Sequence, residues 1–369
     1  MGRKAKLLSK LQNPDNLPTK EQSSFRSVER EFKKTYVNEN DKIPQINYEI
    51  LQSYSEATMH PGIILLKNFL SIEQQKELTK LCMNDFNKLP NLTNLDKYYE
   101  THPEGLFPTY SQYYYSNRKS ILKLKKPHEK LKDIEIQKAF RQIRWVNLGL
   151  SYDWSNKAYY DKNSTDLPEI PSHLIDPPVP EYIQKLVEQA LKAVESQTDY
   201  LAKNYKSEAG IINFYGLKDT LMAHQDRSEQ DSLSPLVSFS IGHSCILLVG
   251  TEDRKDTPIP IILESGDCFI MYGPARRCFH GVPRILENTL PLEFYPSIDR
   301  LETYIQSLDP VNDMFRLPKL KEDLELLRMK EGWNQTRKDW DIFGEYLLES
   351  RLNINIRQVN PAVQKKTEI

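Results

Sequence analysis

The stretch from Arg351 to Arg357 alternates polar and apolar side chains at every position. Because successive side chains of a β-strand point to opposite faces, the stretch is expected to form a strand with two unlike faces. One face carries Arg351, Asn353, Asn355 and Arg357, and the other carries Leu352, Ile354 and Ile356. A polar face with an arginine at each end suits a small dicarboxylate, since guanidinium groups pair carboxylates bidentately. A solvated sheet face is the alternative for this strand taken alone.

Two histidines and one aspartate elsewhere in the chain have the chemistry of a metal site. His224 and Asp226 are two residues apart, so on a strand both side chains reach one face, and His280 follows another strand-like run. Two imidazoles and one carboxylate with positions left open are the facial triad of non-haem Fe(II) oxygenases. Together with the arginines, they predict an Fe(II) site that uses 2-oxoglutarate and O2. A zinc-binding jelly roll of the cupin kind is the alternative, but it gives no role to Arg351 and Arg357.

The predicted fold class is α+β, with a double-stranded β-helix (jelly roll) core and flanking helices. Residues 211–282 consist of short strand-like runs separated by turn signals, which is typical of a sandwich or barrel. A short buried strand is expected at residues 61–66. A helix with a capping box is expected at residues 71–86, and a second helix at residues 180–197.

One catalytic domain, residues 60–360, is the economical division of the chain. Residues 1–40 are expected to be a flexible basic arm with at most one short helix. Nine Lys or Arg stand against four Asp or Glu between positions 1 and 36. Residues 298–347 turn helical and charged, and we expect them to form a helical insertion before the last strand.

Composition limits the class of protein further. The chain has 369 residues, a formal net charge of −1 and 39% hydrophobic residues, enough for a sizeable core. No apolar stretch approaches the roughly 20 residues of a membrane span, and no signal-peptide pattern is present, so no membrane partner is expected. The four cysteines show neither pairing nor zinc spacing, which favours a reducing compartment, cytoplasm or nucleus. A mitochondrial presequence is the alternative for the basic start, and the chain is expected to be a monomer.

The stretch from Arg118 to Arg144 is basic and is flanked by aromatic residues. It holds ten Lys or Arg against three Asp or Glu, with tyrosines before it and Trp145 and Tyr152 after it. Cations that neutralise phosphates beside aromatics that stack on bases are typical of a nucleic-acid surface. An ordinary solvated face is the alternative, because Glu129, Asp133 and Glu135 mix signs within the stretch. A nucleic-acid partner is therefore expected.

These residues, in their order along the chain, resemble the AlkB family of Fe(II)/2-oxoglutarate nucleic-acid dioxygenases. They are most similar to its eukaryotic homologue-1 branch, over roughly residues 60–360. The stretches that carry the resemblance are Arg144–Gly149, Glu208–Tyr215, His224–Glu229, Leu236–Gly242, Ser265–Asp267, His280–Arg284 and Arg351–Val359.

The resemblance implies a role for each matching position. His224, Asp226 and His280 would be the iron ligands. Arg351 would pair the distal carboxylate of 2-oxoglutarate, and Arg357 would lie near its metal-chelating end. The remaining positions fall into two groups: cosubstrate hydrogen bonds from Asn213, Tyr215 and Asn353, and a nucleotide-recognition lid at residues 118–160 with Trp145 and Tyr152.

Two departures from the family pattern bear on the substrate. Ser228 stands where the bacterial founder has an acidic residue that contacts the target base, and Glu229 follows it directly. The gap from His280 to Arg351 is long, as in the homologue-1 branch. Both favour oxidative demethylation of a structured nucleic acid, with N1-methyladenine in tRNA as the expected target and methylated DNA as a further candidate. A protein substrate such as a histone, and a catalytically weak nucleic-acid-binding scaffold, are the alternatives.

Overall fold

A computed structural model describes the chain over residues 24–33, 36–38, 41–45, 62–153, 158–159, 177–198, 200–333 and 337–361. The basic arm predicted for residues 1–40 lies outside the described residues at positions 1–23, 34–35 and 39–40. The lid predicted for residues 118–160 lies outside them at positions 154–157 and 160.

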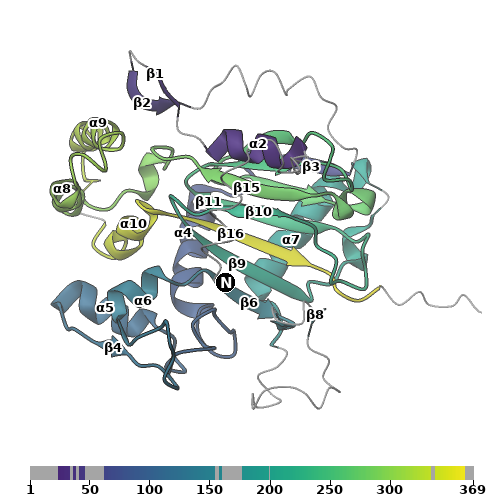
Figure 1. Ribbon diagram of the computed structural model, residues 1–369, viewed down its shortest axis with the longest axis horizontal. Helices are drawn as coiled ribbons and strands as arrows, with labels where there is room; N and C mark the ends of the chain where they lie inside the picture. The colour runs from purple at the N-terminus through teal and green to yellow at the C-terminus, as the bar shows by residue number, and fades with distance from the viewer. Residues whose placement is uncertain are drawn as a thin grey trace, which may run out of the picture.

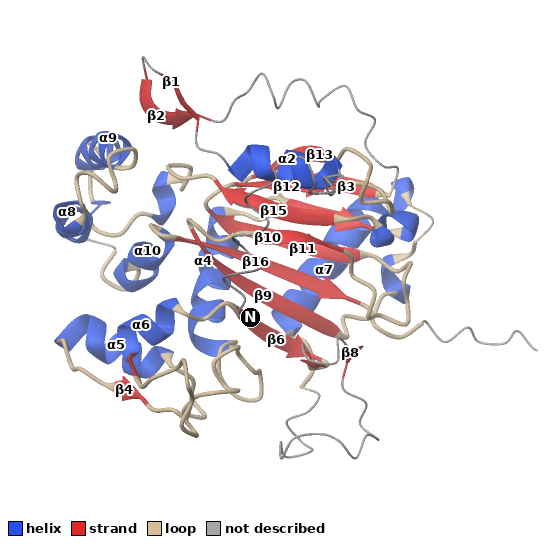
Figure 2. Cartoon of the chain, in the orientation of Figure 1, coloured by secondary structure: helices blue, strands red, loops and turns tan. Residues whose placement is uncertain are grey.

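Two antiparallel sheets form the centre of the molecule (Figures 1 and 2). The large sheet has the strand order β3-β14-β11-β16-β9-β6, and the small sheet has the order β10-β15-β12-β13. The strands of the large sheet are β3 (Ile63–Leu66), β14 (Cys268–Met271), β11 (Leu236–Gly242), β16 (Ser350–Arg357), β9 (Ala209–Gly216) and β6 (Trp145–Gly149). Those of the small sheet are β10 (Leu221–His224), β15 (His280–Ile285), β12 (Cys245–Val249) and β13 (Ile259–Leu263).

Alternation along β16 decides which face of the large sheet meets the core. Leu352, Ile354 and Ile356 are fully buried in the cluster that packs under the helices, together with Val237 and Phe239 of β11. The polar residues of β16 therefore face the small sheet instead, as the period of two requires. This arrangement confirms the predicted jelly roll, with a polar strip on the inner wall of the large sheet.

Two helices cover the outer face of the large sheet. The helix α4 (Ile72–Lys80) is capped by Ser71. The Ser71 side chain accepts a hydrogen bond from the backbone N–H of Gln74, and the Gln74 side chain accepts one from the backbone N–H of Ser71. The predicted capping box is therefore present. A π-helical turn (Leu81–Asp85) continues it. The helix α7 (Glu181–Val194) and the 3-10 turn Glu195–Gln197 match the second predicted helix.

Residues 24–33 of the expected flexible arm form a helix, α2 (Ser24–Lys33), which packs on the outer face of the small sheet (Figure 1). Its Phe25, Val28 and Phe32 recur at helical spacing and are buried against Ile246 and Leu248 of β12. Burial of an apolar stripe of this kind is stabilising, so residues 24–33 form a helix that packs on the small sheet, whereas a flexible arm was predicted.

Helices occupy most of the range predicted as an insertion. They are α8 (Ile298–Ser307), α9 (Leu317–Arg328) and α10 (Asp341–Leu347). Trp333 and Trp340 anchor this part, because each buried indole N–H donates to a backbone carbonyl, of Pro296 and Phe294 respectively. Among the described residues, no helix combines the length and apolar character needed to span a bilayer.

The remaining elements are short. The helices α5 (Phe107–Ser116) and α6 (Ile136–Arg141) lie together at the end of the molecule where β6 begins (Figure 1). Three two-stranded ribbons pair β1 (Tyr36–Asn38) with β2 (Asp41–Gln45), β4 (Ile121–Leu122) with β5 (Ile134–Glu135), and β7 (Tyr152–Asp153) with β8 (Ala158–Tyr159). Isolated 3-10 turns occur at Ala202–Asn204, Gly273–Arg277 and Leu292–Phe294.

Candidate active site

A cavity of about 470 Å³ lies between the two sheets. The predicted residues that line it are His224, Asp226, His280, Asn213, Tyr215, Arg351, Asn353, Arg357, Tyr152, Ser228 and Glu229. Apolar side chains from both sheets also line it, among them Leu247 of β12, Leu263 of β13 and Phe269 of β14. The structure thus brings together all but one of the predicted site residues; Trp145 is not among the lining residues.

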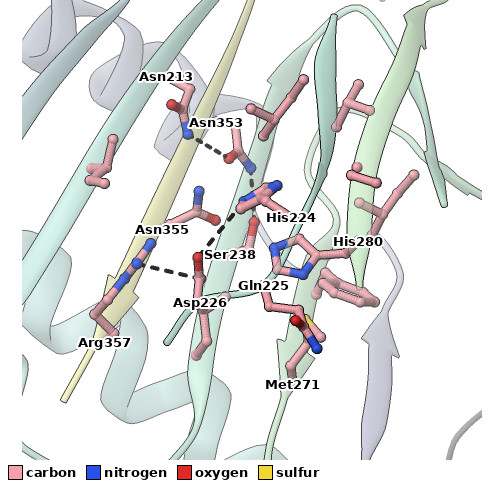
Figure 3. Close-up of a pocket in the computed structure, with 18 of the residues that line it drawn as sticks. Asn213, His224, Gln225, Asp226, Ser238, Met271, His280, Asn353, Asn355 and Arg357 are labelled. Atoms are coloured by element: carbon pink, nitrogen blue, oxygen red, sulfur yellow. Dashed lines mark hydrogen bonds and ion pairs between the residues drawn. The ribbon is translucent and has the colours of Figure 1, made fainter. Parts of the chain in front are cut away.

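The three predicted metal ligands converge at one end of this cavity (Figure 3). His224 is the last residue of β10 and pairs in register with His280, the first residue of β15. Asp226 follows two residues later, and its Oδ1 lies 3.7 Å from Nε2 of His224. One ligand atom from each of the three residues falls within 4.8 Å of the others.

Backbone carbonyls set the orientation of both imidazoles. Nδ1 of His224 lies 3.0 Å from the carbonyl oxygen of Met222, and Nδ1 of His280 lies 3.2 Å from that of Cys278. Because a carbonyl only accepts, each Nδ1 carries the proton and each Nε2 presents a lone pair. A histidine that donates its second N–H to a backbone carbonyl is the usual arrangement around a metal. The donor set and its tautomers therefore fit Fe(II).

The electrostatics of the triad favour the protonation states that a metal needs. Burial alone would raise the pKa of Asp226, but the guanidinium of Arg357 holds it below its ordinary value. Burial and the neighbouring His224 lower the pKa of His280 to about 4. An ionised carboxylate and a neutral imidazole are the metal-binding forms of these groups.

Arg351 lies at the other end of the polar strip and is 1% exposed. Its Nη1 donates to the carbonyl of His243 at 2.6 Å, and its Nη2 donates to Oγ of Ser240 at 2.7 Å. These two bonds fix the plane of the guanidinium at the cavity wall. A fixed guanidinium is suited to one carboxylate of a dicarboxylate.

Arg357 connects the polar strip to the triad (Figure 3). Its Nη1 lies 3.4 Å from Oδ2 of Asp226 and 3.1 Å from Oε1 of Glu229. Its Nε is buried and has no hydrogen-bond partner within the described part of the chain. A buried N–H without a partner costs free energy, so this group favours an acceptor such as a cosubstrate carboxylate.

Amide side chains fill the strip between the two arginines. Nδ2 of Asn213 lies 3.4 Å from Oδ1 of Asn353, and Nδ2 of Asn353 donates to Oγ of Ser238 at 2.8 Å (Figure 3). Tyr215 is buried on the same face. Ser238 and Ser240 of β11, which are not among the predicted site residues, contact Asn353 and Arg351. Their signal was present, because Ser238 and Ser240 alternate with apolar residues as β16 does.

Of the residues expected to contact a nucleotide, Tyr152 and Ser228 meet at the cavity. The hydroxyls of Tyr152 and Ser228 are 3.0 Å apart, and the Tyr152 ring packs edge-on against Tyr159 with centroids at 5.2 Å. Trp145 pairs with Asn213 on β6, the outermost strand of the large sheet. Antiparallel partners share a face, so Trp145 lies on the cavity side of the sheet, at its edge.

Glu229 is buried in a network of charged and hydroxyl groups. Its carboxylate accepts from Arg357 at 3.1 Å, from Arg276 at 3.3 Å and from the hydroxyl of Tyr159 at 2.8 Å. The side chains of Glu229 and Arg276 are 2% and 1% exposed. The Glu229 carboxylate is thus bonded to two arginines and a tyrosine. Arg276 and Tyr159 carried no signal in the sequence.

The basic stretch 118–144 includes β4, β5 and α6 and forms a separate surface next to α5. Lys123, Lys125 and Lys126 are exposed there, and Lys125 donates to the carbonyl of Asp96. No residue of the stretch lines the cavity. The stretch 118–144 ends where β6 begins, whereas Tyr152 comes after the end of β6, so the two lie at opposite ends of this strand (Figure 1).

Residues 62–357 match the sequence profile of the 2OG-Fe(II) oxygenase superfamily. The chain is 37% identical to "tRNA demethylase abh1" of Schizosaccharomyces pombe over 63% of this chain and 70% of that protein. It is 30% identical to "Nucleic acid dioxygenase ALKBH1" of Mus musculus over 81% of this chain and 64% of that protein. It is 28% identical to "DNA N(6)-methyladenine demethylase ALKBH1A" of Arabidopsis thaliana over 81% and 75% respectively. The chain therefore spans between 64% and 75% of the length of these relatives.

Proposed function

The chain belongs to the 2OG-Fe(II) oxygenase superfamily, in the AlkB homologue-1 branch, and from this premise we propose that it demethylates nucleic-acid bases oxidatively. The observation that carries the proposal is the convergence of His224, Asp226 and His280 on one cavity with Arg351 and Arg357. All three relatives are named for action on nucleic acids.

The cofactors are Fe(II), 2-oxoglutarate and O2. His224, Asp226 and His280 would hold the iron, and Arg351 and Arg357 would hold the two ends of 2-oxoglutarate. Bound together, they supply the oxidation of an N-methyl group by O2, with 2-oxoglutarate converted to succinate and CO2, and the hydroxylated methyl leaves as formaldehyde.

The contribution of the chain is placement and exclusion of water. The carbonyls of Met222 and Cys278 keep the lone pairs of the imidazoles directed at the metal position. Arg357 keeps Asp226 ionised, and the serine and amide side chains of the polar strip offer fixed donors to the cosubstrate. Leu247, Leu263 and Phe269 make part of the cavity lining apolar, and this lining would exclude water from that part of the cavity.

The proposed target is N1-methyladenine in tRNA. A methyl group on the Watson–Crick edge abolishes pairing, so such a base is easily unstacked and held against an aromatic side chain such as Tyr152. The hydroxyls of Tyr152 and Ser228, which lie 3.0 Å apart at the cavity wall, would offer hydrogen bonds to the base. The exposed lysines of the 118–144 surface support a substrate large enough to reach beyond the cavity. The yeast relative's name supports the choice of tRNA.

A parallel comparison of substrates tests the proposal. Purified protein with Fe(II), ascorbate and 2-oxoglutarate is incubated with tRNA carrying N1-methyladenine, with single-stranded DNA carrying methylated adenine, and with methylated histone peptides. Loss of the methyl group and release of formaldehyde should be fastest on tRNA, and Tyr152→Ala should slow them. Activity confined to the peptide contradicts the nucleic-acid assignment. Preference for DNA contradicts the choice of tRNA alone.

A further inference from the structure

The helix α2 lies outside residues 62–357, the part of the chain that matches the superfamily, yet it packs on the strands that carry the metal ligands. It lies over the small sheet in Figure 1. Phe25 is fully buried, packs edge-on against Phe279 at 6.4 Å, and sits so close to Gly250 that a Cβ there would meet its ring at 3.0 Å. This close fit fixes the position of α2 on the sheet.

A charged group lies in the middle of this apolar contact. Glu29 is 0% exposed and pairs with Arg26 of the same helix at 2.6 Å. Its Oε1 accepts the backbone N–H of Ala223, 194 residues away in sequence, at 3.0 Å. Burial of a carboxylate is costly unless it is paired and hydrogen-bonded, and the bond to Ala223 is one of the interactions that offset this cost.

The N–H of Ala223 and the C=O of Met222 belong to one peptide group. That carbonyl accepts from Nδ1 of His224, at 3.0 Å. Because a peptide group is planar and stiff, an interaction that fixes its N–H also fixes the direction of its C=O. The contact from Glu29 to Ala223 is therefore transmitted to the imidazole of His224 through a single peptide plane.

The strand β10 needs such support. Among the described strands it is an edge strand that pairs with β15 alone. The pairing with β15 shifts register between Leu221 and His224, so the regular ladder is interrupted just before the ligand. An irregular edge strand held on one side has more conformational freedom than a strand inside a sheet.

We propose that Glu29 is a positioning residue for the iron site: it fixes the Met222–Ala223 peptide, and this peptide orients His224 toward Asp226 and His280. The inference rests on the ligand set of the proposed function. It assigns to the segment before the family domain a part in metal binding, which the comparisons do not assign to it.

Binding of Co(II) to the full-length protein tests the inference without any nucleic-acid substrate. Loss of a group that orients a metal ligand typically weakens metal affinity by about 10- to 100-fold. Glu29→Met preserves length and helix propensity but removes the acceptor, so the dissociation constant for Co(II) should rise about tenfold or more. Glu29→Gln keeps an oxygen acceptor for Ala223, so its dissociation constant should stay within about threefold of wild type. Glu31→Met, on the same helix, is the matched control and should leave it unchanged.

Two further measurements separate the outcomes. Amide hydrogen exchange at Ala223 should accelerate in Glu29→Met and not in Glu31→Met. Should Glu29→Met not fold, Glu29→Asp withdraws the carboxylate by one methylene while keeping the charge, and it should weaken Co(II) binding as well. If the wild-type protein binds Co(II) tightly and neither Glu29→Met nor Glu29→Asp weakens this binding, Glu29 does not position the site. That result would leave the proposed function standing. A wild-type protein that binds no Co(II) overturns the ligand set, and with it the proposed function.

Discussion

Arg357 and Asp226 lie 3.4 Å apart, so the arginine expected to bind the cosubstrate also contacts a metal ligand. Burial alone would lower the pKa of Arg357, but the carboxylates of Asp226 and Glu229 raise it well above its ordinary value. The guanidinium therefore stays charged, and it keeps Asp226 ionised in turn. The proposed metal site and the proposed cosubstrate site therefore share one buried charge network.

The carboxylate of Glu229 balances charge in this network, because it pairs with both buried arginines, Arg276 and Arg357. Glu229→Gln leaves the buried guanidinium groups of Arg276 and Arg357 with one carboxylate fewer. Breaking a buried ion pair by removing one partner costs on the order of 3 kcal/mol or more. The free energy of unfolding, measured by urea denaturation of the metal-free protein, should fall by about that amount.

An exposed ion pair of the same residue types supplies the control. Glu252 pairs with Arg277 at 2.9 Å, but their side chains are 52% and 48% exposed. Exposed pairs contribute roughly 0–1 kcal/mol, so Glu252→Gln should change the free energy of unfolding little. Equal effects of the two substitutions would mean that Glu229 does not balance the buried arginines.

Arg351→Lys tests the cosubstrate site. A lysine keeps the charge but cannot donate to His243 and Ser240 in the plane of the guanidinium while also pairing a carboxylate bidentately. The apparent affinity for 2-oxoglutarate should fall about tenfold or more, equivalent to roughly 1.4 kcal/mol. Demethylation at saturating 2-oxoglutarate should change less. Arg277→Lys, on the surface, should leave the affinity unchanged, and an unchanged affinity in Arg351→Lys as well would mean that Arg351 does not bind the cosubstrate.

The 118–144 surface is tested by charge reversal. Replacing Lys123, Lys125 and Lys126 with Glu should weaken tRNA binding and flatten its dependence on salt, since fewer phosphates are neutralised. Turnover of 2-oxoglutarate without nucleic acid should persist, because these lysines lie outside the cavity. The same triple reversal at Lys185, Lys192 and Lys203, which are exposed near α7, is the control. Similar salt slopes for both triple variants would show that the 118–144 surface is only solvated.

The features that could be predicted from the sequence are those with local periodicity. The alternation from Arg351 to Arg357 was enough to place its polar residues on one inner wall, because the period of a strand depends only on neighbouring residues. The buried stripe of α7 and the cap at Ser71 follow from local rules in the same way. The convergence of His224, Asp226 and His280 needed the resemblance as well as the spacing.

The features that could not be predicted depend on register and on contacts between distant segments. Trp145 is expected to contact the nucleotide, and its place at the edge of the large sheet, on the cavity side, follows from the pairing of β6 with β9. The partners of Glu229 come from three separate segments, at Tyr159, Arg276 and Arg357. The stripe of Phe25, Val28 and Phe32 was readable in the sequence, but the surface that it covers was not.

His243 gives the chain a predictable dependence on pH. Burial lowers the pKa of His243 to about 4, below the ordinary value of about 6.5. Between pH 6.5 and pH 4 the unfolded chain therefore binds a proton at His243 that the folded chain does not bind. The stability that the buried neutral His243 contributes is complete above pH 6.5 and is lost as the pH falls toward 4. Acidification from pH 6.5 to pH 5 should cost about 1.5 kcal/mol at this residue. His243→Gln should reduce the pH dependence of the free energy of unfolding by that amount, and an unchanged slope would contradict this assignment.

The stoichiometry of the reaction tests the central claim most directly. Wild-type protein and the His224→Ala, Asp226→Ala and His280→Ala variants are incubated with Fe(II), 2-oxoglutarate and tRNA carrying N1-methyladenine, and succinate, formaldehyde and lost methyl groups are counted. The account predicts one formaldehyde for each methyl group lost by the wild-type protein, and one succinate beyond the amount formed without nucleic acid. It predicts none of the three products above background from any folded variant. Methyl loss without succinate, or undiminished turnover in any of the three variants, would contradict it.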